Sequence, residues 1–265
     1  MKQEKLGLRG EFAGLVAVVT GACQGIGRAI AEELHGRGAH LVLVDCNAEG
    51  VQATAAALRK AGRADVDFRV ADLAEPAAIA ALAAQIAALV TKVDVLVNNA
   101  GIENDLSFHQ VTAQVFDRVI AVNLRAPFLL SQALAAQFPV GGGAIVNIGS
   151  IHASHAFPNA IPYACSKAGL MALTRNLALE LAARHIRVNA VCPGYIDTPM
   201  WDAWLRTAPD PQALAAETTA LHPLGRRGLP ADVAAAVAYL AGPGAAWVTG
   251  THLVVDGGLT IRAHP

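Results

Sequence analysis

Short apolar runs rich in β-branched residues alternate along this chain with longer segments of helical periodicity. The runs are continuously apolar, a pattern typical of parallel strands that are covered on both faces. Strand–helix alternation predicts right-handed βαβ units and a doubly wound α/β sheet with helices on both faces. The predicted strands are 15–20, 41–45, 66–70, 93–98, 144–148, 187–191 and 252–255, and the predicted helices are 27–37, 48–61, 76–90, 113–136, 162–184 and 230–241.

One segment breaks this rhythm. Residues 201–221 carry two tryptophans and two prolines between the sixth and seventh strands, and the segment is too long for a plain connection. Ligands of open α/β sheets bind beyond the carboxyl ends of the strands, so we expect a substrate lid at about 200–222. A surface excursion is the alternative. Because no linker or repeat divides the chain, residues 1–265 are predicted to form a single domain.

Composition excludes several classes of protein. A hydrophobic content of 54% rules out a disordered chain, and 20 Lys and Arg against 21 Asp and Glu leave no basic excess for nucleic acid. Residues 126–166 lack charge, but prolines and glycines interrupt them, so we expect no membrane span. The N-terminus has no apolar signal region, and the four cysteines lack C-x-x-C spacing. We therefore expect a cytoplasmic protein with free thiols and no metal site.

A glycine-rich turn, from Thr20 to Gly27, joins the first strand to the first helix. Glycines allow a tight turn and close approach to a phosphate, and the helix N-terminus offers free N–H groups. The spacing is G-x-x-x-G-x-G rather than the more usual dinucleotide pattern G-x-G-x-x-G. The turn predicts a pyrophosphate site, with a purely structural turn as the alternative.

Asp45 ends the second strand. A carboxylate at this position binds the ribose hydroxyls of an adenosine and repels a 2′-phosphate. Neither Gln24 nor Cys46 supplies a cation for that phosphate. The sequence therefore favours NAD over NADP, while an acidic helix cap is the alternative reading of Asp45.

Tyr163 and Lys167 lie four residues apart at the start of a predicted helix, on one face. An ammonium beside a phenol favours the phenolate, so the pair can exchange a proton nearer neutral pH. Ser150 follows the fifth strand and places a hydroxyl at the same sheet edge. Asn123 is a polar amide among apolar neighbours, so it needs partners from a kinked backbone or a water.

Together these motifs resemble the short-chain dehydrogenase/reductase family in its single-domain, Rossmann-type form. The resemblance extends from about Phe12 to Leu259. It implies a seven-stranded parallel sheet and a homo-oligomer, either a dimer or a tetramer. A leucine stripe on the predicted helix 162–184 suits packing across a two-fold axis, although it could serve the internal core alone.

The resemblance also implies a role for each matching residue. Tyr163 is implied as the general acid/base, Ser150 as the holder of the substrate oxygen, Lys167 as the ribose ligand that lowers the pKa of Tyr163, and Asn123 as the holder of a relay water. Gly21, Gln24 and Ile26 are implied to line the pyrophosphate, Asp45 to bind the adenosine ribose, Asp72 and Leu73 to flank the adenine, and Asn99 and Ala100 to line the adenosine side. Pro193, Gly194, Ile196 and Thr198 are implied to surround the nicotinamide carboxamide. The remaining implied cofactor residues are Gly25, Gly27, Gly101, Tyr163 and Lys167. The candidate substrate residues are Ser150, His152, Phe157, Tyr163, Met200 and Trp204.

Three functions stay open on the sequence. The first is an NAD-dependent dehydrogenase that interconverts a secondary alcohol and a ketone on a sugar, polyol or similar small molecule. Ser150-Ile151-His152 supports it, because some sugar dehydrogenases of the family carry Ser-Val-His there. The second is a reductase of 3-oxoacyl groups or general ketones. A basic patch for an acidic carrier would favour it, and Arg226-Arg227 is the only compact basic pair near the expected entrance. The third is a non-catalytic NAD(H)-binding regulator.

Overall fold

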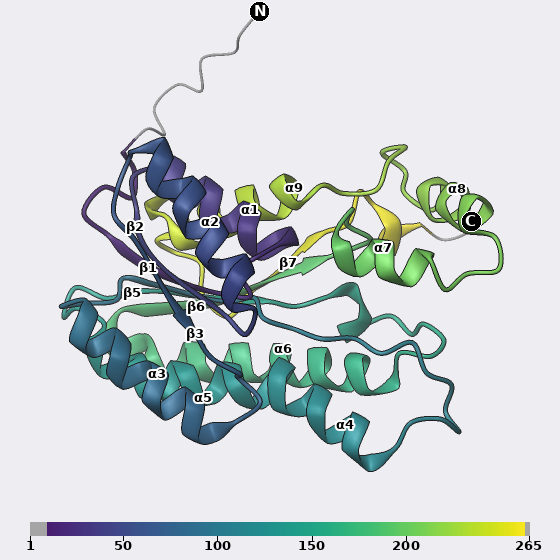
Figure 1. Ribbon diagram of the computed structural model, residues 1–265, viewed down its shortest axis with the longest axis horizontal. Helices are drawn as coiled ribbons and strands as arrows, with labels where there is room; N and C mark the ends of the chain where they lie inside the picture. Colours follow the sequence, from purple (N-terminus) through teal and green to yellow (C-terminus); the bar gives the residue numbers. More distant parts are fainter. Residues whose placement is uncertain (1–9, 263–265) are drawn as a thin grey trace, which may run out of the picture.

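A computed structural model describes residues 10–262, which form one doubly wound α/β domain (Figure 1). Its seven strands are all parallel and lie in the order β3-β2-β1-β4-β5-β6-β7. The order reverses between β1 and β4, which is where such sheets bind ligands. The strands are β1 (Val16–Thr20), β2 (His40–Asp45), β3 (Val66–Val70), β4 (Val95–Asn98), β5 (Gly143–Ile148), β6 (Ile186–Pro193) and β7 (His252–Val255).

Successive side chains of each strand enter different cores, because strand residues alternate between the two faces of a sheet. In β1, Ala17 and Val19 pack with α1, α2 and α9, whereas Val16 and Val18 pack with α3, α5 and α6. Figure 1 shows these two helical layers on either side of the sheet. The helices are α1 (Gly25–Gly36), α2 (Ala48–Ala61), α3 (Pro76–Leu89), α4 (Ala113–Ile120), α5 (Ala126–Leu134), α6 (Ile161–Leu181), α7 (Pro199–Leu205), α8 (Pro211–Ala220) and α9 (Pro230–Ala241).

The predicted helix 113–136 is a composite. A π-helical turn, Ala121–Arg125, joins α4 to α5, and a short 3-10 turn ends the stretch at Gln137. Ala113–Gln137 has the length and hydropathy of a membrane span, but half of its most apolar window is buried. Since α5 packs on α3 and α4 packs on α6, the stretch behaves as a core helix of a globular domain.

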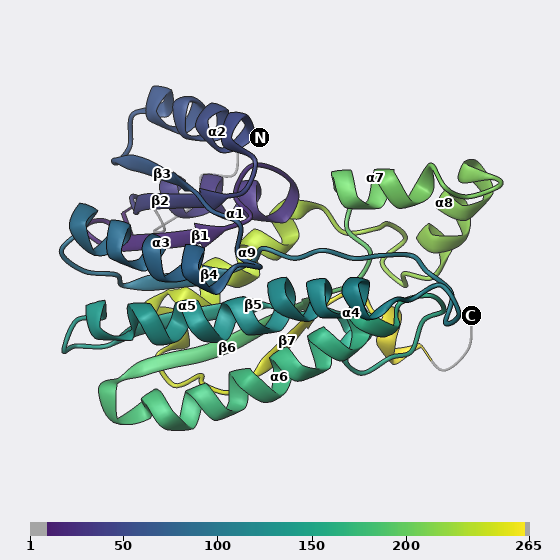
Figure 2. The ribbon, with the colours of Figure 1, turned by 60° about the horizontal axis from the view of Figure 1, so that its bottom comes forward.

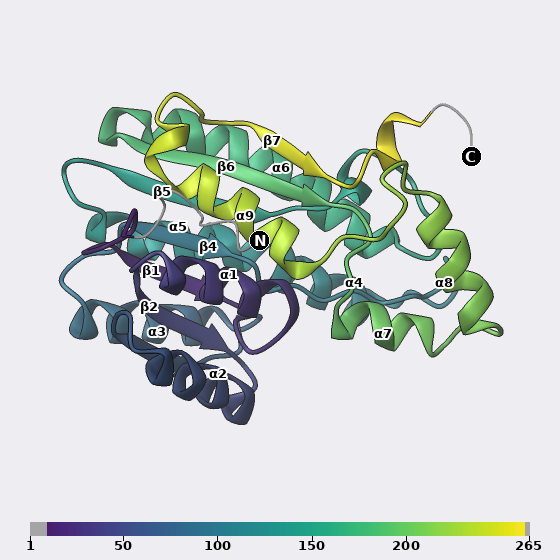
Figure 3. The same cartoon turned by 90° about the horizontal axis from the view of Figure 1, so that it is seen from above.

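Residues 201–221, where the strand–helix rhythm breaks, contain most of α7 and all of α8. Both helices lie beyond the carboxyl ends of the strands and stand apart from the two helical layers (Figures 2 and 3). Strands β3 and β7 and helices α2 and α9 have the predicted bounds. The other predicted elements differ by one to three residues at an end, where helices fray and strand pairing stops.

Candidate active site

The glycine-rich turn between β1 and α1 is a cradle that side chains would fill. Gly21 has φ +65°, and a Cβ there would lie 2.8 Å from Asn99 Nδ2. A Cβ on Gly27 would collide with the carbonyl oxygen of Gly21. Helix α1 starts at Gly25 and has no side-chain cap from Gln24, so no N-cap side chain occupies its first N–H groups. This geometry fits a dinucleotide pyrophosphate.

The end of β4 braces the cradle. The Asn99 amide donates to the carbonyl oxygens of Thr20 (2.9 Å) and Gly21 (3.1 Å). The Thr20 hydroxyl oxygen accepts from the backbone N–H groups of Asn99 and Ala100 at 3.0 Å. The Asn99 side chain, which the sequence assigned to the adenosine, therefore holds the loop that would receive the phosphates.

Asp45 stands at the carboxyl end of β2, almost fully buried. Its carboxylate accepts from the backbone N–H groups of Cys23 and Asn47, both at 3.0 Å. Burial and the Asp45 carboxylate raise the pKa of the Cys23 thiol to about 12. Burial, Asp45 and Asp72 likewise raise the pKa of Cys46. The charges that act on both thiols are thus negative.

Asp72 and Leu73, expected beside the adenine, follow β3. The Asp72 carboxylate pairs with Arg118 of α4 at 2.9 Å, and Leu73 is buried in the core. The backbone N–H of Ala74 lowers the pKa of Asp72, burial opposes it, and the Arg118 guanidinium lowers the pKa further, so that the net shift is downward.

Tyr163 and Lys167 share one face of α6, next to Ser150. The Lys167 Nζ lies 5.4 Å from the centre of the Tyr163 ring and donates to the carbonyl of Ile148 at 2.7 Å. Burial lowers the pKa of Lys167 to about 8 against the opposing charges of Cys192 and Glu103.

The pKa of Tyr163 departs from the direction expected from Lys167. Burial raises the pKa of the phenol, and the Glu103 carboxylate raises it further, while a hydrogen bond with Ser150 lowers it. The net shift is upward, because loss of water around a phenolate outweighs the single hydrogen bond. Sequence reasoning counted one neighbouring ammonium and missed both the burial and Glu103.

Asn123 lies in the π-helical turn and is fully buried. Its Oδ1 accepts from the N–H of Ile102 and its Nδ2 donates to the carbonyl of Ile102, both at 2.9 Å. Nδ2 also donates to the Ser166 hydroxyl at 3.1 Å. A Cβ on Gly101 would lie 3.5 Å from Asn123 Oδ1 and 3.6 Å from Lys167 Nζ, so Asn123 and Lys167 flank this glycine. The partners that the buried amide needs therefore come from the loop after β4 and from a hydroxyl of α6, and not from the π-helical turn itself.

The segment after β6 carries the residues expected at the nicotinamide. Pro193 and Ile196 are buried, and a Cβ on Gly194 would lie 2.9 Å from the Asp256 side chain. The Thr198 hydroxyl accepts from the N–H of Trp201 at 3.2 Å and so caps α7. The turn that would hold the nicotinamide is thereby continuous with the predicted lid.

Aromatic side chains form a wall that starts at Tyr163. His152 meets the Tyr163 ring edge-on and stacks on Phe157 at 4.2 Å between ring centres. Phe157 meets Tyr195 edge-on, and Tyr195 stacks on Trp204 of α7 at 6.1 Å. Burial lowers the pKa of His152 to about 4, and its Nδ1 is buried without a partner among the described residues.

A hydrogen bond joins the end of this wall to the loop after β4. Trp204 Nε1 donates to Asp105 Oδ2 at 3.0 Å. Met200, the other candidate substrate residue on α7, is 44% exposed. Sequence reasoning missed Glu103 and Asp105, which lie two and four residues after Gly101, and Tyr195, which lies between Gly194 and Ile196.

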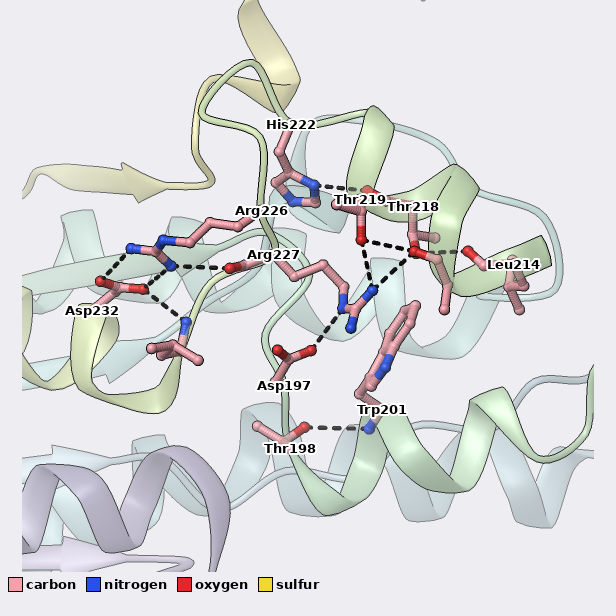
Figure 4. Close-up of polar contacts among 12 residues, drawn as sticks. Asp197, Thr198, Trp201, Leu214, Thr218, Thr219, His222, Arg226, Arg227 and Asp232 are labelled. Atoms are coloured by element: carbon pink, nitrogen blue, oxygen red, sulfur yellow. Dashed lines mark hydrogen bonds and ion pairs between the residues drawn. The ribbon is translucent and has the colours of Figure 1, made fainter. Parts of the chain in front are cut away.

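Arg227 anchors the predicted lid (Figure 4). Its guanidinium donates to Asp197 at 2.6 Å and to the Thr219 hydroxyl of α8 at 2.8 Å. It also lies 4.7 Å from the ring centre of Trp201 in α7. Arg226 points away from the lid and makes a two-pronged ion pair with Asp232. Neither arginine of the basic pair is free of an acidic partner.

Known proteins match this chain over most of its length. A family model described as enoyl-(acyl carrier protein) reductase matches residues 21–260. A cis-4-hydroxycyclohexanecarboxylate dehydrogenase of Sinomonas cyclohexanicum is 43% identical, with 94% of this chain and 98% of that protein covered. A D-threitol dehydrogenase of Mycolicibacterium smegmatis is 38% identical, with 94% of each chain covered. A 3-oxoacyl-[acyl-carrier-protein] reductase of Escherichia coli is 38% identical, with 94% and 98% covered.

Solved structures agree with the fold. The crystal structure of a putative NAD(P)-dependent gluconate 5-dehydrogenase from Beutenbergia cavernae, with NADP bound at low occupancy, has a TM-score of 0.87 and 40% identity. It covers 94% of this chain and 98% of its own. The match spans the glycine cradle and the Tyr163–Lys167 pair alike. This chain therefore belongs to the short-chain dehydrogenase/reductase family of oxidoreductases.

Proposed function

We propose that this protein is an NAD(H)-dependent dehydrogenase that interconverts a secondary alcohol and a ketone on a sugar, polyol or similar small hydroxylated molecule. One observation carries the reaction class. Tyr163, Ser150 and Lys167 meet at the carboxyl edge of the sheet, beside a glycine cradle fit for a dinucleotide. The intact set also argues against a non-catalytic regulator.

The residues divide the proton chemistry among themselves. Ser150 holds the substrate oxygen, and Tyr163 takes the hydroxyl proton during oxidation or returns it during reduction. The Lys167 ammonium, close beneath the Tyr163 ring, stabilises the phenolate that forms. We propose that Asn123 holds a water that carries the proton onward from Lys167. The bound nicotinamide supplies the hydride acceptor or donor.

The preference for NAD rests on Asp45. This buried carboxylate at the end of β2 repels a ribose 2′-phosphate. The charges that act on the neighbouring Cys23 and Cys46 thiols are also negative, so they indicate no cation that would attract the phosphate. The gluconate 5-dehydrogenase structure holds NADP, so members of this family differ in cofactor. We place Gly21, Gly25 and Gly27 at the pyrophosphate.

The substrate class rests on the aromatic wall and on relatives. His152 is neutral near pH 7 and its buried Nδ1 has no partner among the described residues, so its imidazole can donate to or accept from a substrate hydroxyl according to its tautomer. Tryptophan and tyrosine faces, such as Trp204 and Tyr195, suit the C–H faces of a small polyol. Relatives named for threitol and for gluconate act on hydroxylated substrates of this kind.

Reduction of 3-oxoacyl groups is the second candidate, favoured by the reductase of Escherichia coli and by the acyl-carrier description of the family model. An acidic carrier protein requires a free basic surface. In this chain Arg226 is paired with Asp232 and Arg227 with Asp197. The engaged arginines favour the small-molecule substrate.

A rate screen tests the proposal. Purified protein is mixed with NAD or NADP and a panel of sugars, polyols, hydroxy acids and secondary alcohols, and absorbance of the reduced cofactor is followed. We expect turnover of a polyol or sugar with NAD, and a loss of about 10²-fold or more in Tyr163→Phe with NADH binding retained. Turnover only of 3-oxoacyl esters with NADPH would replace this proposal by the second candidate.

A further inference from the structure

Two distant segments of the chain meet at the rim of the candidate active site. Trp204 Nε1 donates to Asp105 Oδ2 at 3.0 Å, although 99 positions separate the two residues. Asp105 lies in the loop after β4, and Trp204 lies in α7 of the predicted lid. This hydrogen bond, which we call the latch, ties the lid to the loop, and the catalytic set does not use it.

Packing holds the indole of Trp204 from two other sides. Its ring stacks on Tyr195 with 6.1 Å between ring centres and 8° between ring planes, and it meets Trp201 edge-on at 5.1 Å. Trp201 is buried and lies 4.7 Å from the Arg227 guanidinium. An indole has a single hydrogen-bond donor, Nε1. Because the ring is held, that donor keeps the direction in which Asp105 accepts it.

The loop that carries Asp105 is fixed at two places. Asn123 binds both backbone groups of Ile102 at 2.9 Å. The N–H of Leu106 donates to the carbonyl oxygen of Asn159 at 3.2 Å. Asn159 has φ +59°, a left-handed conformation that asparagine adopts more readily than most residues. The lid therefore meets Asp105 on a short segment that is held on both sides.

These contacts close a ring beside Tyr163. The ring returns to its starting point along the chain, and we call it the mouth ring: Phe157, Tyr195, Trp204, Asp105, Leu106 and Asn159. His152 joins the mouth ring to Tyr163, because it stacks on Phe157 and meets the Tyr163 ring edge-on. Every member of the mouth ring is half-buried or exposed, so the ring lies at the surface next to the catalytic phenol and not in the core.

We propose that the latch determines substrate length: it closes the mouth ring over a small free alcohol and excludes substrates whose chain extends through the mouth. The inference rests on the proposed function and adds a size limit to it. A short polyol lies wholly within the closed ring. A long or carrier-bound chain crosses the ring and keeps Trp204 away from Asp105, so the substrate loses the binding that the closed lid supplies. The limit depends on length and not on charge.

The latch can open without unfolding of the domain. Trp204 is half-buried and Asp105 is exposed, and α7 and α8 stand apart from the two helical layers (Figure 2). Segments of this kind open locally at a small fraction of the free energy of global unfolding. Substrate entry and product release then depend on the same opening of the lid.

Matched pairs of substrates test the proposal. The first pair is threitol against 1-O-octylthreitol, and the second is 1,2-propanediol against 1,2-octanediol, each with NAD. If the rate screen gives a faster short alcohol, that alcohol and its octyl ether form a further pair. With the wild-type protein we expect kcat/KM to favour the short member at least about tenfold.

Asp105→Ala removes the acceptor of the latch. We expect this ratio of kcat/KM to fall to about one, because the KM for the short member rises about tenfold while that for the long member does not. We expect kcat to stay at or above the wild-type value, since an open lid does not delay product release. A merely destabilised protein would lose kcat instead.

Four further variants separate the latch from a structural role. Asp105→Asn keeps an oxygen acceptor for the indole, so it should keep the length preference. Trp204→Phe keeps a ring against Tyr195 and removes the donor, so it should match Asp105→Ala. The double variant of Asp105→Ala and Trp204→Phe should show no more than either single change, because both remove the same bond. Asp117→Ala removes an exposed carboxylate from α4 and should change nothing.

The outcomes distinguish this inference from the proposed function. Equal kcat/KM for the two members in the wild type would overturn the latch and leave the proposed function standing. So would a length preference that Asp105→Ala leaves unchanged, or a loss of kcat at unchanged KM, with normal NADH affinity. No turnover of any alcohol by the wild type would overturn both. If Asp105→Ala fails to bind NADH, Trp204→Phe decides by the same criteria.

Discussion

At the scale of single residues, we propose that the buried carboxylate of Asp45 decides between NAD and NADP. Asp45→Ala removes the acceptor for the ribose hydroxyls and the charge that repels a 2′-phosphate. We expect the KM for NAD to rise about tenfold and the NAD-to-NADP ratio of kcat/KM to fall toward one. Steady-state kinetics with both cofactors measure this change.

Asp67→Ala is the matched control for that experiment. Asp67 lies in β3 and pairs with His40 at the start of β2, away from the carboxyl edge of the sheet. We expect its removal to leave the cofactor ratio unchanged. Equal ratios in the wild type and Asp45→Ala would contradict the assignment of Asp45.

His152 makes stability depend on pH. Its pKa is about 4 in the folded chain, against an ordinary value of 6.5, so below pH 6.5 the unfolded chain binds a proton that the folded chain does not. Folding stability should therefore fall as pH drops from about 6.5 toward 4, by about 2 kcal/mol after allowance for solvent screening. Urea unfolding of the wild type and of His152→Gln across this window measures the difference in slope. Parallel curves would show that His152 titrates normally.

At the scale of elements, one arginine joins both helices of the predicted lid to the rest of the domain. Arg227→Ala removes the contacts with Asp197, Thr219 and the Trp201 ring together. We expect the substrate KM to rise about tenfold and limited proteolysis to cut within 199–221 sooner, because α7 and α8 lose their anchor. Arg226→Ala removes an exposed ion pair with Asp232 and a hydrogen bond to the backbone carbonyl of Arg227, neither of which reaches α7 or α8, and it should alter neither readout. Equal effects of the two variants would argue against the anchor.

The composite helix shows how an element serves the site. In a regular helix through residues 113–137 the Asn123 side chain would point in a different direction. The extra residue in the π-helical turn changes that direction. In the observed turn the amide meets both backbone groups of Ile102. The same turn thus fixes the loop that carries Glu103.

At the scale of the whole molecule, the predicted homo-oligomer stays a prediction. The leucine stripe of α6 serves mainly this chain's own core. Leu170 is buried in a small cluster against which Leu173 packs, and Leu177 and Leu181 pack against the core between the sheet, α3 and α5. Leu179, at 80% exposed, is the apolar residue of α6 most open to a second copy. We expect light scattering to give two or four times the monomer mass of 27.3 kDa, and Leu179→Glu to lower it. A wild-type monomer would contradict the prediction.

The sequence by itself determined the fold class and predicted the candidate catalytic set. Continuous β-branched runs indicate a parallel sheet, and carboxyl ends of parallel strands share one edge, so residues that follow strands, such as Ser150 and Asn99, were bound to meet there. The spacing of the glycines from Gly21 to Gly27 likewise predicted the cradle, where a Cβ on Gly21 or Gly27 would collide with neighbouring atoms. These inferences depend on a few neighbouring residues, which is why a pattern suffices.

Only the tertiary structure decided the electrostatics and the substrate side of the site. The upward pKa shift of Tyr163 comes from burial and from Glu103, 60 positions away in the chain. The contact of Trp204 with Asp105 joins segments that are 99 positions apart, and Arg227 reaches Asp197 across 30. Desolvation and long-range contacts depend on how distant elements pack, and no local pattern of residues records that packing.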